Sequence, residues 1–212
     1  MLSAASIATL LQPFADVPAG LAAQLQTYLE LLLRWNAHTN LTAIRDPEQI
    51  VTRHFGESLF AAKVLRDAGA FVATTPTLSD IGSGAGFPGI PIKLLFPNIQ
   101  LTLIESQNKK ATFLREVLRT LNLTDAEVFS GRAETWNRTA RVITLRAVEN
   151  FERTLPVAAA LVAPSGMLCL LIGAEQVPSA KATLAPGWHF HEPVTTPLSN
   201  ERVVVVGGRA QV

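Results

Sequence analysis

The sequence predicts an α/β protein in which a doubly wound, mostly parallel sheet follows an N-terminal helical lobe. Two observations predict this class. Apolar side chains recur at helical spacing through residues 1–70, and after Gly69 short apolar runs alternate with helical stretches. Strands that are separated by helices are typical of parallel sheets with helices on both faces. We therefore expect a helical lobe at residues 1–70 and a sheet domain at residues 71–212.

The lobe is predicted from two helical patterns. Residues 21–35 place a set of apolar side chains on one helical face, namely Leu21, Leu25, Tyr28, Leu29, Leu32 and Leu33. A second helix is predicted to begin at Asp46, because Asp46 can cap it and Pro47 suits a first helical turn. Gln49 stands at the capping-box position of the same helix.

The sheet domain is predicted from buried apolar runs. The expected strands are 78–81, 101–105, 127–129, 142–145 and 167–172, followed by 189–194 and 202–206. The expected helices between them are 90–96, 109–122, 151–162 and 176–184. Cys169 lies inside one of these apolar runs and is expected in the core, as are Trp136 and Trp188.

The composition fits a folded protein that needs no cross-links. The chain has 212 residues, 48% of them hydrophobic and 17% charged, with a net charge of +1. A single cysteine excludes a disulfide framework, and with four scattered histidines we expect no metal site. No uninterrupted apolar stretch is long enough to span a membrane, and the N-terminus lacks a signal-peptide pattern. We expect a cytoplasmic monomer with no membrane partner.

A glycine-rich loop follows the first predicted strand. Gly82, Gly84, Gly86 and Gly89 lie between that strand and a helix, where open α/β sheets bind ligands. Residues 84–89 fit the dinucleotide pattern GxGxxG, with Glu105 at a spacing that suits a ribose-binding acid. Residues 80–86 instead read Asp-x-Gly-x-Gly-x-Gly, which resembles the first motif of class I S-adenosylmethionine-dependent methyltransferases.

Asp80 favours the methyltransferase interpretation of this loop. A carboxylate near a pyrophosphate would meet like charge, whereas S-adenosylmethionine carries an ammonium and a sulfonium and no phosphate. Glu105 ends the second predicted strand and can accept both ribose hydroxyls under either interpretation, although a solvated strand-end carboxylate is the alternative. Residues 131–134, after the third strand, are where such an enzyme would contact adenine, and a plain turn is the alternative there.

Two long blocks resemble one family specifically. Residues 35–47, with Arg53-His54 and Glu57-Ser58-Leu59, and the block Asp80-Ile81-Gly82-Ser83-Gly84-Ala85-Gly86-Phe87-Pro88-Gly89-Ile90-Pro91 are similar to the bacterial small-subunit ribosomal RNA guanine-N7 methyltransferases, formerly called glucose-inhibited division protein B. Weaker similarity continues through residues 105–114, 131–134, 146–147 and 201–205.

The resemblance implies a class I methyltransferase domain at residues 71–212 that transfers a methyl group from S-adenosylmethionine to guanine N7 in 16S ribosomal RNA. Its partner would be 16S ribosomal RNA or the small ribosomal subunit. The cofactor-binding residues that it implies are Gly82, Phe87, Ala133, Glu134 and Arg146, while Asp80, Gly84, Gly86 and Glu105 fit the wider class I pattern. One position departs from the family, since Ile172 stands where a lysine is usual.

The residues agree with chemistry at N7. Guanine N7 has an in-plane lone pair and no proton, so the reaction needs positioning rather than a general base, and we expect no catalytic side chain. Cys169 is expected in the core, so cytosine-C5 transfer is disfavoured. The segment Leu145–Val148 lacks the Asn/Asp-Pro-Pro-aromatic motif of exocyclic-amine methylases. Arg146 would oppose the charge that forms on guanine, so we assign it to the cofactor or to phosphate.

Arg45, Arg53 and His54 are the candidate RNA-binding residues, because they flank the N-terminal block and can contact phosphates. Helix capping and hydrogen bonding between the two parts of the chain are the alternative roles for them. Three other functions remain open: a methyltransferase of another substrate, a non-catalytic module that keeps the cofactor loop, and a nicotinamide-dependent oxidoreductase.

Overall fold

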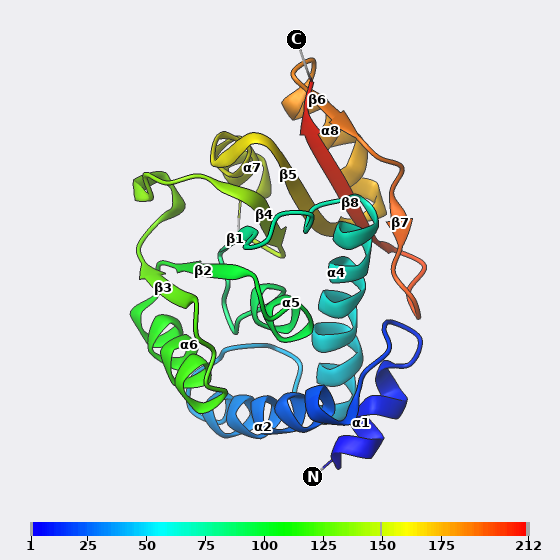
Figure 1. The fold of residues 1–212 in the computed structure, drawn as a ribbon, viewed down its shortest axis with the longest axis vertical. Helices are drawn as coiled ribbons and strands as arrows, with labels where there is room; N and C mark the ends of the chain where they lie inside the picture. Colours follow the sequence, from blue (N-terminus) through cyan, green and yellow to red (C-terminus); the bar gives the residue numbers. More distant parts are fainter. Residues whose placement is uncertain (1, 149, 211–212) are drawn as a thin grey trace.

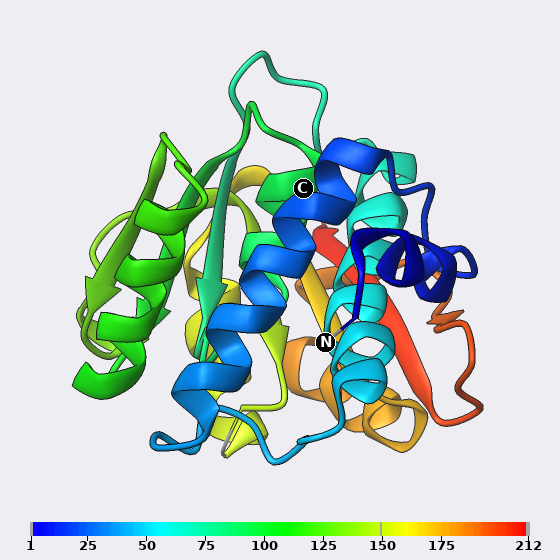
Figure 2. The same cartoon turned by 90° about the horizontal axis from the view of Figure 1, so that it is seen from below.

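The computed structural model describes residues 2–148 and 150–210, which form one central sheet with helices on both faces (Figure 1, Figure 2). The strand order is β3-β2-β1-β4-β5-β8-β6, and β7 pairs with β8. The strands are β1 Thr77–Ile81, β2 Gln100–Glu105, β3 Ala126–Ser130, β4 Ala140–Arg146, β5 Val162–Gly173, β6 Trp188–Phe190, β7 Val194–Thr195 and β8 Arg202–Arg209. Strands β1 to β5 are parallel, and β8 is antiparallel to its neighbours, which confirms the predicted α/β class.

The helices divide between the two faces of the sheet. They are α1 Ala4–Leu11, α2 Ala19–Asn36, α3 Pro47–Ile50, the π-helix η1 Val51–Gly56, α4 Glu57–Asp67, α5 Gly89–Leu95, α6 Asn108–Thr120, the 3-10 helix η2 Ala133–Thr135, α7 Phe151–Ala160, the 3-10 helix η3 Ala174–Gln176 and α8 Val177–Leu184. Side chains alternate along each strand, so Val142 belongs to the buried cluster on the face of α1, α2, α4, α5 and α6, while Ile143 belongs to the cluster on the face of α7 and α8.

The N-terminal helices share one hydrophobic core with the sheet. Tyr28 and Phe55 belong to the same buried cluster as Leu101 and Leu103 of β2, and α2 crosses in front of the sheet in Figure 2. The predicted start of the second helix is confirmed, because Asp46 Oδ1 accepts a hydrogen bond of 2.8 Å from the backbone N–H of Gln49. The division at residue 70 stays a prediction.

The structure corrects one predicted strand. Residues 189–194 were expected to form a single strand, but β6 ends at Phe190 and β7 begins at Val194. Pro193 has no N–H to donate to a ladder, and the two short strands pair with different halves of β8. The π-helical turn η1 within the second helix had no signal in the apolar pattern.

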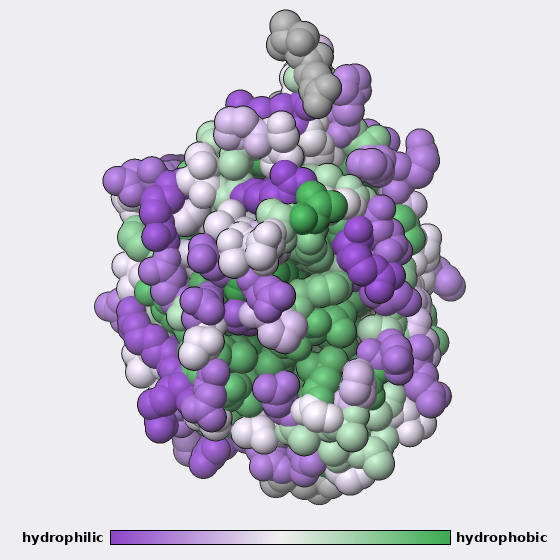
Figure 3. Space-filling view, in the orientation of Figure 1, coloured by the Kyte–Doolittle hydropathy of each residue, from purple (hydrophilic) through white to green (hydrophobic). Residues whose placement is uncertain are grey.

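The face of the molecule seen in Figure 3 is mostly hydrophilic at its margins. On the face seen in Figure 1, an apolar area lies near the centre and is surrounded by hydrophilic side chains (Figure 3). Within residues 2–148 and 150–210, no helix is long and apolar enough to cross a membrane.

Candidate functional site

A cavity of about 340 Å³ lies at the carboxyl edge of the parallel strands. The arrow of β1 points down in Figure 2, so this edge is at the lower end of that view. Four of the predicted cofactor residues line the cavity: Gly82, Glu105, Ala133 and Glu134. The structure therefore brings together the ends of β1, β2 and β3, with Val148 beyond β4 closing another side. Asp80, Gly84, Gly86, Phe87 and Arg146 are not in its lining.

Three glycines of the loop, Gly82, Gly84 and Gly86, are required for different structural reasons. Gly82, Gly84 and Gly86 all have positive φ, at +66°, +58° and +91°. A Cβ at Gly82 would lie 2.9 Å from Val148, and one at Gly86 would strike the Tyr28 hydroxyl and Ile90. A Cβ at Gly84 would meet nothing closer than the carbonyl of Gly82 at 3.8 Å. Gly84 therefore borders open space, while Gly82 and Gly86 are needed for packing.

The Asp80 side chain connects the glycine loop to the neighbouring strand β4. Its Oδ1 accepts a hydrogen bond of 2.7 Å from the Thr144 hydroxyl, and its Oδ2 accepts one of 3.2 Å from the backbone N–H of Gly89. The carboxyl group is fully buried, and this burial raises its pKa to about 6, although the hydrogen bond from Thr144 opposes the shift. Asp80 thus joins β1 to β4 and to the start of α5.

Glu105 connects the second strand to the loop. One carboxylate oxygen accepts a hydrogen bond of 2.9 Å from the backbone N–H of Gly84, and the other accepts one of 2.7 Å from the N–H of Gln107. Each oxygen keeps a second lone pair that can accept a hydroxyl from a ligand in the cavity. The sequence-based role of Glu105 as a diol acceptor is compatible with this geometry.

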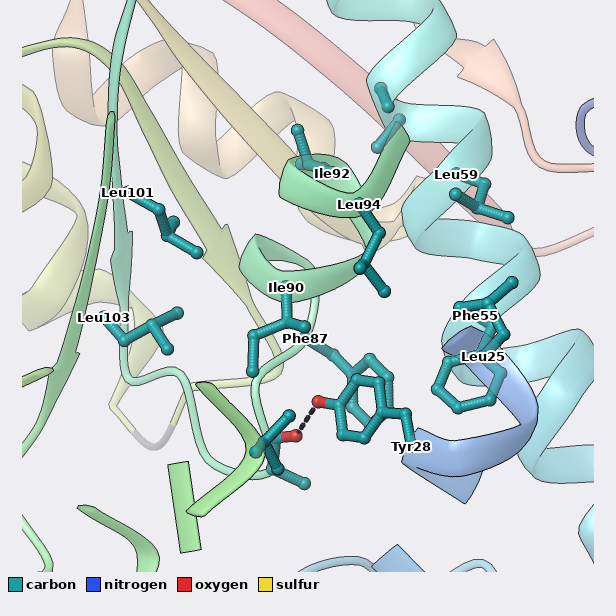
Figure 4. Packing of buried hydrophobic residues seen from close by; sticks show 14 of the residues in the cluster. Leu25, Tyr28, Phe55, Leu59, Phe87, Ile90, Ile92, Leu94, Leu101 and Leu103 are labelled. Atoms are coloured by element: carbon teal, nitrogen blue, oxygen red, sulfur yellow. Dashed lines mark hydrogen bonds between the residues drawn. The ribbon is translucent and has the colours of Figure 1, made fainter. Parts of the chain in front are cut away.

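Aromatic side chains support the loop on the face covered by the N-terminal helices. The Tyr28 hydroxyl donates to the carbonyl of Ala85 (Figure 4). The Phe87 ring lies between two others, stacked at 5.5 Å on Tyr28 and at 4.8 Å on His54. Phe87 is buried, so in this structure it anchors the loop to the helical layer.

Arg146 ends β4 and is bound to the N-terminal helices. Its Nη2 donates to Glu57 Oε2 at 3.0 Å and to the carbonyl of Arg53 at 2.6 Å, and lies 3.1 Å from Nδ1 of His54. Its Nε is buried and has no partner among the described residues. Glu57 also binds Arg53 and Arg202. Sequence reasoning missed Glu57 and Arg202, although the spacing of Arg53 and Glu57 on a predicted helix was an available signal for that pair.

His54 uses both ring nitrogens inside the protein. Nε2 lies 2.8 Å from the Thr42 hydroxyl, and Nδ1 faces Arg146. Burial, with the nearby charge of Arg146, lowers the pKa of His54 to about 3, so the ring is neutral. Arg45, by contrast, is exposed, and its partners among the described residues are neutral: the carbonyl of Asn36 at 2.7 Å and Asn40 Oδ1 at 2.8 Å.

Of the remaining candidate side chains, Trp136, Cys169 and Ile172 lie in the core, and Trp188 lies at its edge. Trp136 and Cys169 are buried as predicted, and burial raises the pKa of the Cys169 thiol. Trp188 is partly buried and packs against the cluster beneath α7 and α8. Ile172, which stands where the family usually has a lysine, is buried in that same cluster and is therefore part of the hydrophobic core. In the described part of the chain, no group of three His, Cys, Asp or Glu side chains is placed to hold a metal ion.

Solved structures of methyltransferases share this fold. The ribosomal protein L11 methylase from Lactobacillus delbrueckii subsp. bulgaricus matches with a TM-score of 0.61 at 13% identity, over 74% of this chain and 80% of that chain. The tRNA m1G37 methyltransferase of M. jannaschii matches with a TM-score of 0.58 at 10% identity, over 72% of this chain and 49% of that chain. These similarities confirm the class I methyltransferase fold.

Sequence comparison identifies the family. Ribosomal RNA small subunit methyltransferase G from Stenotrophomonas maltophilia K279a is 40% identical over 205 residues, which cover 93% of this chain and 90% of the relative. The protein of that name from Xanthomonas euvesicatoria pv. vesicatoria 85-10 is 40% identical over 199 residues, which cover 90% of this chain and 88% of the relative. Residues 21–185 match the family model described as rRNA small subunit methyltransferase G. The chain therefore belongs to the rRNA small subunit methyltransferase G family.

Proposed function

We propose that this chain transfers a methyl group from S-adenosylmethionine to N7 of a guanine in 16S ribosomal RNA. The observation that carries the proposal is the cavity at the carboxyl edge of the sheet, which Gly82 and Glu105 line, with the Glu105 carboxylate hydrogen-bonded to the glycine loop at Gly84. This edge is where open α/β sheets bind ligands. Family membership supports ribosomal RNA as the substrate class.

The residues present fit the cofactor. Glu105 would accept the ribose hydroxyls, and Ala133 and Glu134 would border the adenine. Gly84 leaves room for close approach to the backbone. The buried Nε of Arg146, which has no partner among the described residues, would donate to the cofactor carboxylate. When bound, S-adenosylmethionine supplies an electrophilic methyl group on its sulfonium.

The acceptor explains why the cavity needs no proton-abstracting dyad. The lone pair of guanine N7 can attack the methyl group without prior loss of a proton, so the protein has to hold the base in line with the bond that breaks. No histidine, cysteine or tyrosine lines the cavity in the part of the chain that the structure describes. Glu105 is held by two backbone N–H groups and would serve as a fixed acceptor for the cofactor.

RNA contacts are proposed at the N-terminal block. Arg45 is exposed and is oriented by the Asn36 carbonyl and the Asn40 side chain, so its charge has no acidic partner among the described residues and suits a phosphate. Arg53 is also exposed. The role of His54 toward RNA stays a prediction, and its internal partners favour positioning of Arg146 and Phe87.

The test is transfer of a labelled methyl group. Purified protein is incubated with S-adenosylmethionine labelled in the methyl group and with small ribosomal subunits, free 16S RNA or assembly intermediates that lack the modification. Labelled nucleosides are then identified after digestion. Label in 7-methylguanosine is expected. Binding of S-adenosylmethionine without transfer would indicate a non-catalytic module, label in another nucleoside would indicate another substrate, and binding of a nicotinamide dinucleotide instead would refute the assignment of the loop.

A further inference from the structure

A buried carboxylate joins three arginines at the carboxyl edge of the sheet. Glu57, at the start of α4, is contacted by Arg53 Nε at 3.1 Å, Arg146 Nη2 at 3.0 Å and Arg202 Nε at 3.0 Å. These four residues, which we call the Glu57 cluster, come from η1, α4, β4 and β8. Only 4% of the Glu57 side chain is exposed.

The Glu57 cluster carries more positive than negative charge. Three guanidiniums face one carboxylate, and the neutral ring of His54 adds no charge. Asp80 is the other carboxyl group whose charge reaches Arg146, and its oxygens are bound to Thr144 and Gly89. One carboxylate cannot balance three guanidiniums, so the cluster keeps positive charge with which an anionic ligand can pair. The charges of all three arginines also lower the pKa of the neighbouring His54.

The outer end of the Glu57 cluster reaches the surface. The side chains of Arg53 and Arg202 are 48% and 28% exposed, whereas Arg146 is only 7% exposed. Glu57 binds both outer arginines through Nε, and their Nη groups make no bond to another described residue. The carboxylate therefore fixes two guanidiniums while leaving the donors that bind phosphate free.

The Glu57 cluster lies beside the cofactor cavity. Arg202 begins the antiparallel strand β8 opposite Gly173, the last residue of β5, so it is at the carboxyl edge. Arg146, at the end of β4, belongs to the cluster, while Ala147 and Val148 directly after it line the cavity. An anion on the outer arginines would thus lie across the end of β4 from the cavity.

We infer that Arg53 and Arg202 form a binding site for one backbone phosphate of the RNA substrate, and that Glu57 holds the two guanidiniums in place. This inference rests on the proposed function and extends it by assigning Arg202 and Glu57. Glu57 also binds Arg146, so the same carboxylate orients the arginines toward the RNA and the arginine proposed for the cofactor. A phosphate fixed here restrains the RNA next to the base that is methylated.

The test compares charge-removing variants with a matched control. Arg53→Gln and Arg202→Gln each remove one outer guanidinium, and Arg66→Gln removes an exposed arginine near the end of α4 that pairs with Asp67. Affinity for unmodified 16S RNA is measured over a salt series, and S-adenosylhomocysteine affinity is measured by calorimetry. Each outer variant is expected to weaken RNA binding about 5-fold to 10-fold at low salt and to reduce the salt slope by about 1. Affinity for S-adenosylhomocysteine is expected to stay within about 2-fold of wild type.

The outcomes separate the inference from the proposed function. A salt slope for Arg53→Gln and Arg202→Gln equal to that of wild type and Arg66→Gln would overturn the phosphate site even if wild-type protein methylates the RNA. Loss of S-adenosylhomocysteine affinity as large as the loss of RNA affinity would also overturn it. Wild-type protein that neither binds nor methylates the RNA would refute both. If Arg202→Gln does not fold, Arg202→Lys is tested instead and is expected to keep the wild-type salt slope of RNA binding. Arg53→Gln, at a half-exposed position, then provides the test of charge removal, and an unchanged salt slope in that variant would overturn the phosphate site.

Discussion

Replacing Gly84 with alanine separates backbone strain from loss of ligand space. Gly84 has a φ of +58°, and an added Cβ would meet no atom closer than 3.8 Å. Without ligand, the substitution should therefore lower the unfolding free energy only by the cost of the left-handed backbone conformation of alanine, about 1 kcal/mol. For a chain of this size that corresponds to a fall in Tm of about 2–4 °C. The methyl group would project into the space proposed for the cofactor, so affinity for S-adenosylhomocysteine should fall at least about 10-fold, or about 1.4 kcal/mol.

The assay pairs thermal unfolding with calorimetry, and Gly69→Ala is the matched control. Gly69 also has a positive φ, +79°, and open space around its Cβ position, but it follows α4, before β1, and is not part of the glycine loop. The control should lose similar stability and bind normally. Gly84→Val, with a larger and branched side chain, should abolish binding. Normal binding by folded Gly84→Val, or equal loss of binding in the Gly69 control, would refute the assignment of the glycine loop.

Three further predictions concern residues that support the loop. Tyr28→Phe leaves the carbonyl of Ala85 without its donor and should cost about 1–3 kcal/mol of unfolding free energy, measured in urea; an unchanged midpoint would contradict it. The pKa of Asp80 is raised from 3.8 to about 6, so the folded state binds a proton more tightly than the unfolded state does. The resulting stabilisation is complete below about pH 4 and is lost as the pH rises through 6. Over that range the unfolding free energy of the wild type should fall relative to that of Asp80→Asn. His54 has a pKa lowered from 6.5 to about 3, so wild type should lose stability relative to His54→Gln as pH falls from about 6.5 toward 3, and a pH-independent difference would count against a buried neutral ring.

Local sequence signals were enough to predict most of the sheet. Buried parallel strands are short apolar runs, so β1, β2 and β4 were each predicted to within two residues at either end. The glycine loop was recognisable because its spacing is local. The single strand expected at 189–194 was wrong because Pro193 interrupts the ladder, an effect that the apolar pattern does not report.

The Glu57 cluster could not be predicted in the same way. Glu57 meets Arg146 and Arg202 across sequence separations of 89 and 145 residues. No periodic pattern links positions that far apart, and only the packing of α4 against the ends of β4 and β8 brings them together. The sequence resemblance pointed to Arg146 for the cofactor, but its ion pair with the N-terminal helices emerges only from the fold.

Methylation of guanine N7 in the small-subunit ribosomal RNA can be measured directly in cells. The most direct measurement is position-resolved mapping of 7-methylguanosine in 16S RNA from cells that lack their own enzyme and express either this chain or its Gly84→Val variant. We expect one site of 7-methylguanosine with the wild-type chain and none with the variant. The absence of 7-methylguanosine in cells that contain folded wild-type protein would refute this activity, and its appearance with the variant would refute the role of the glycine loop.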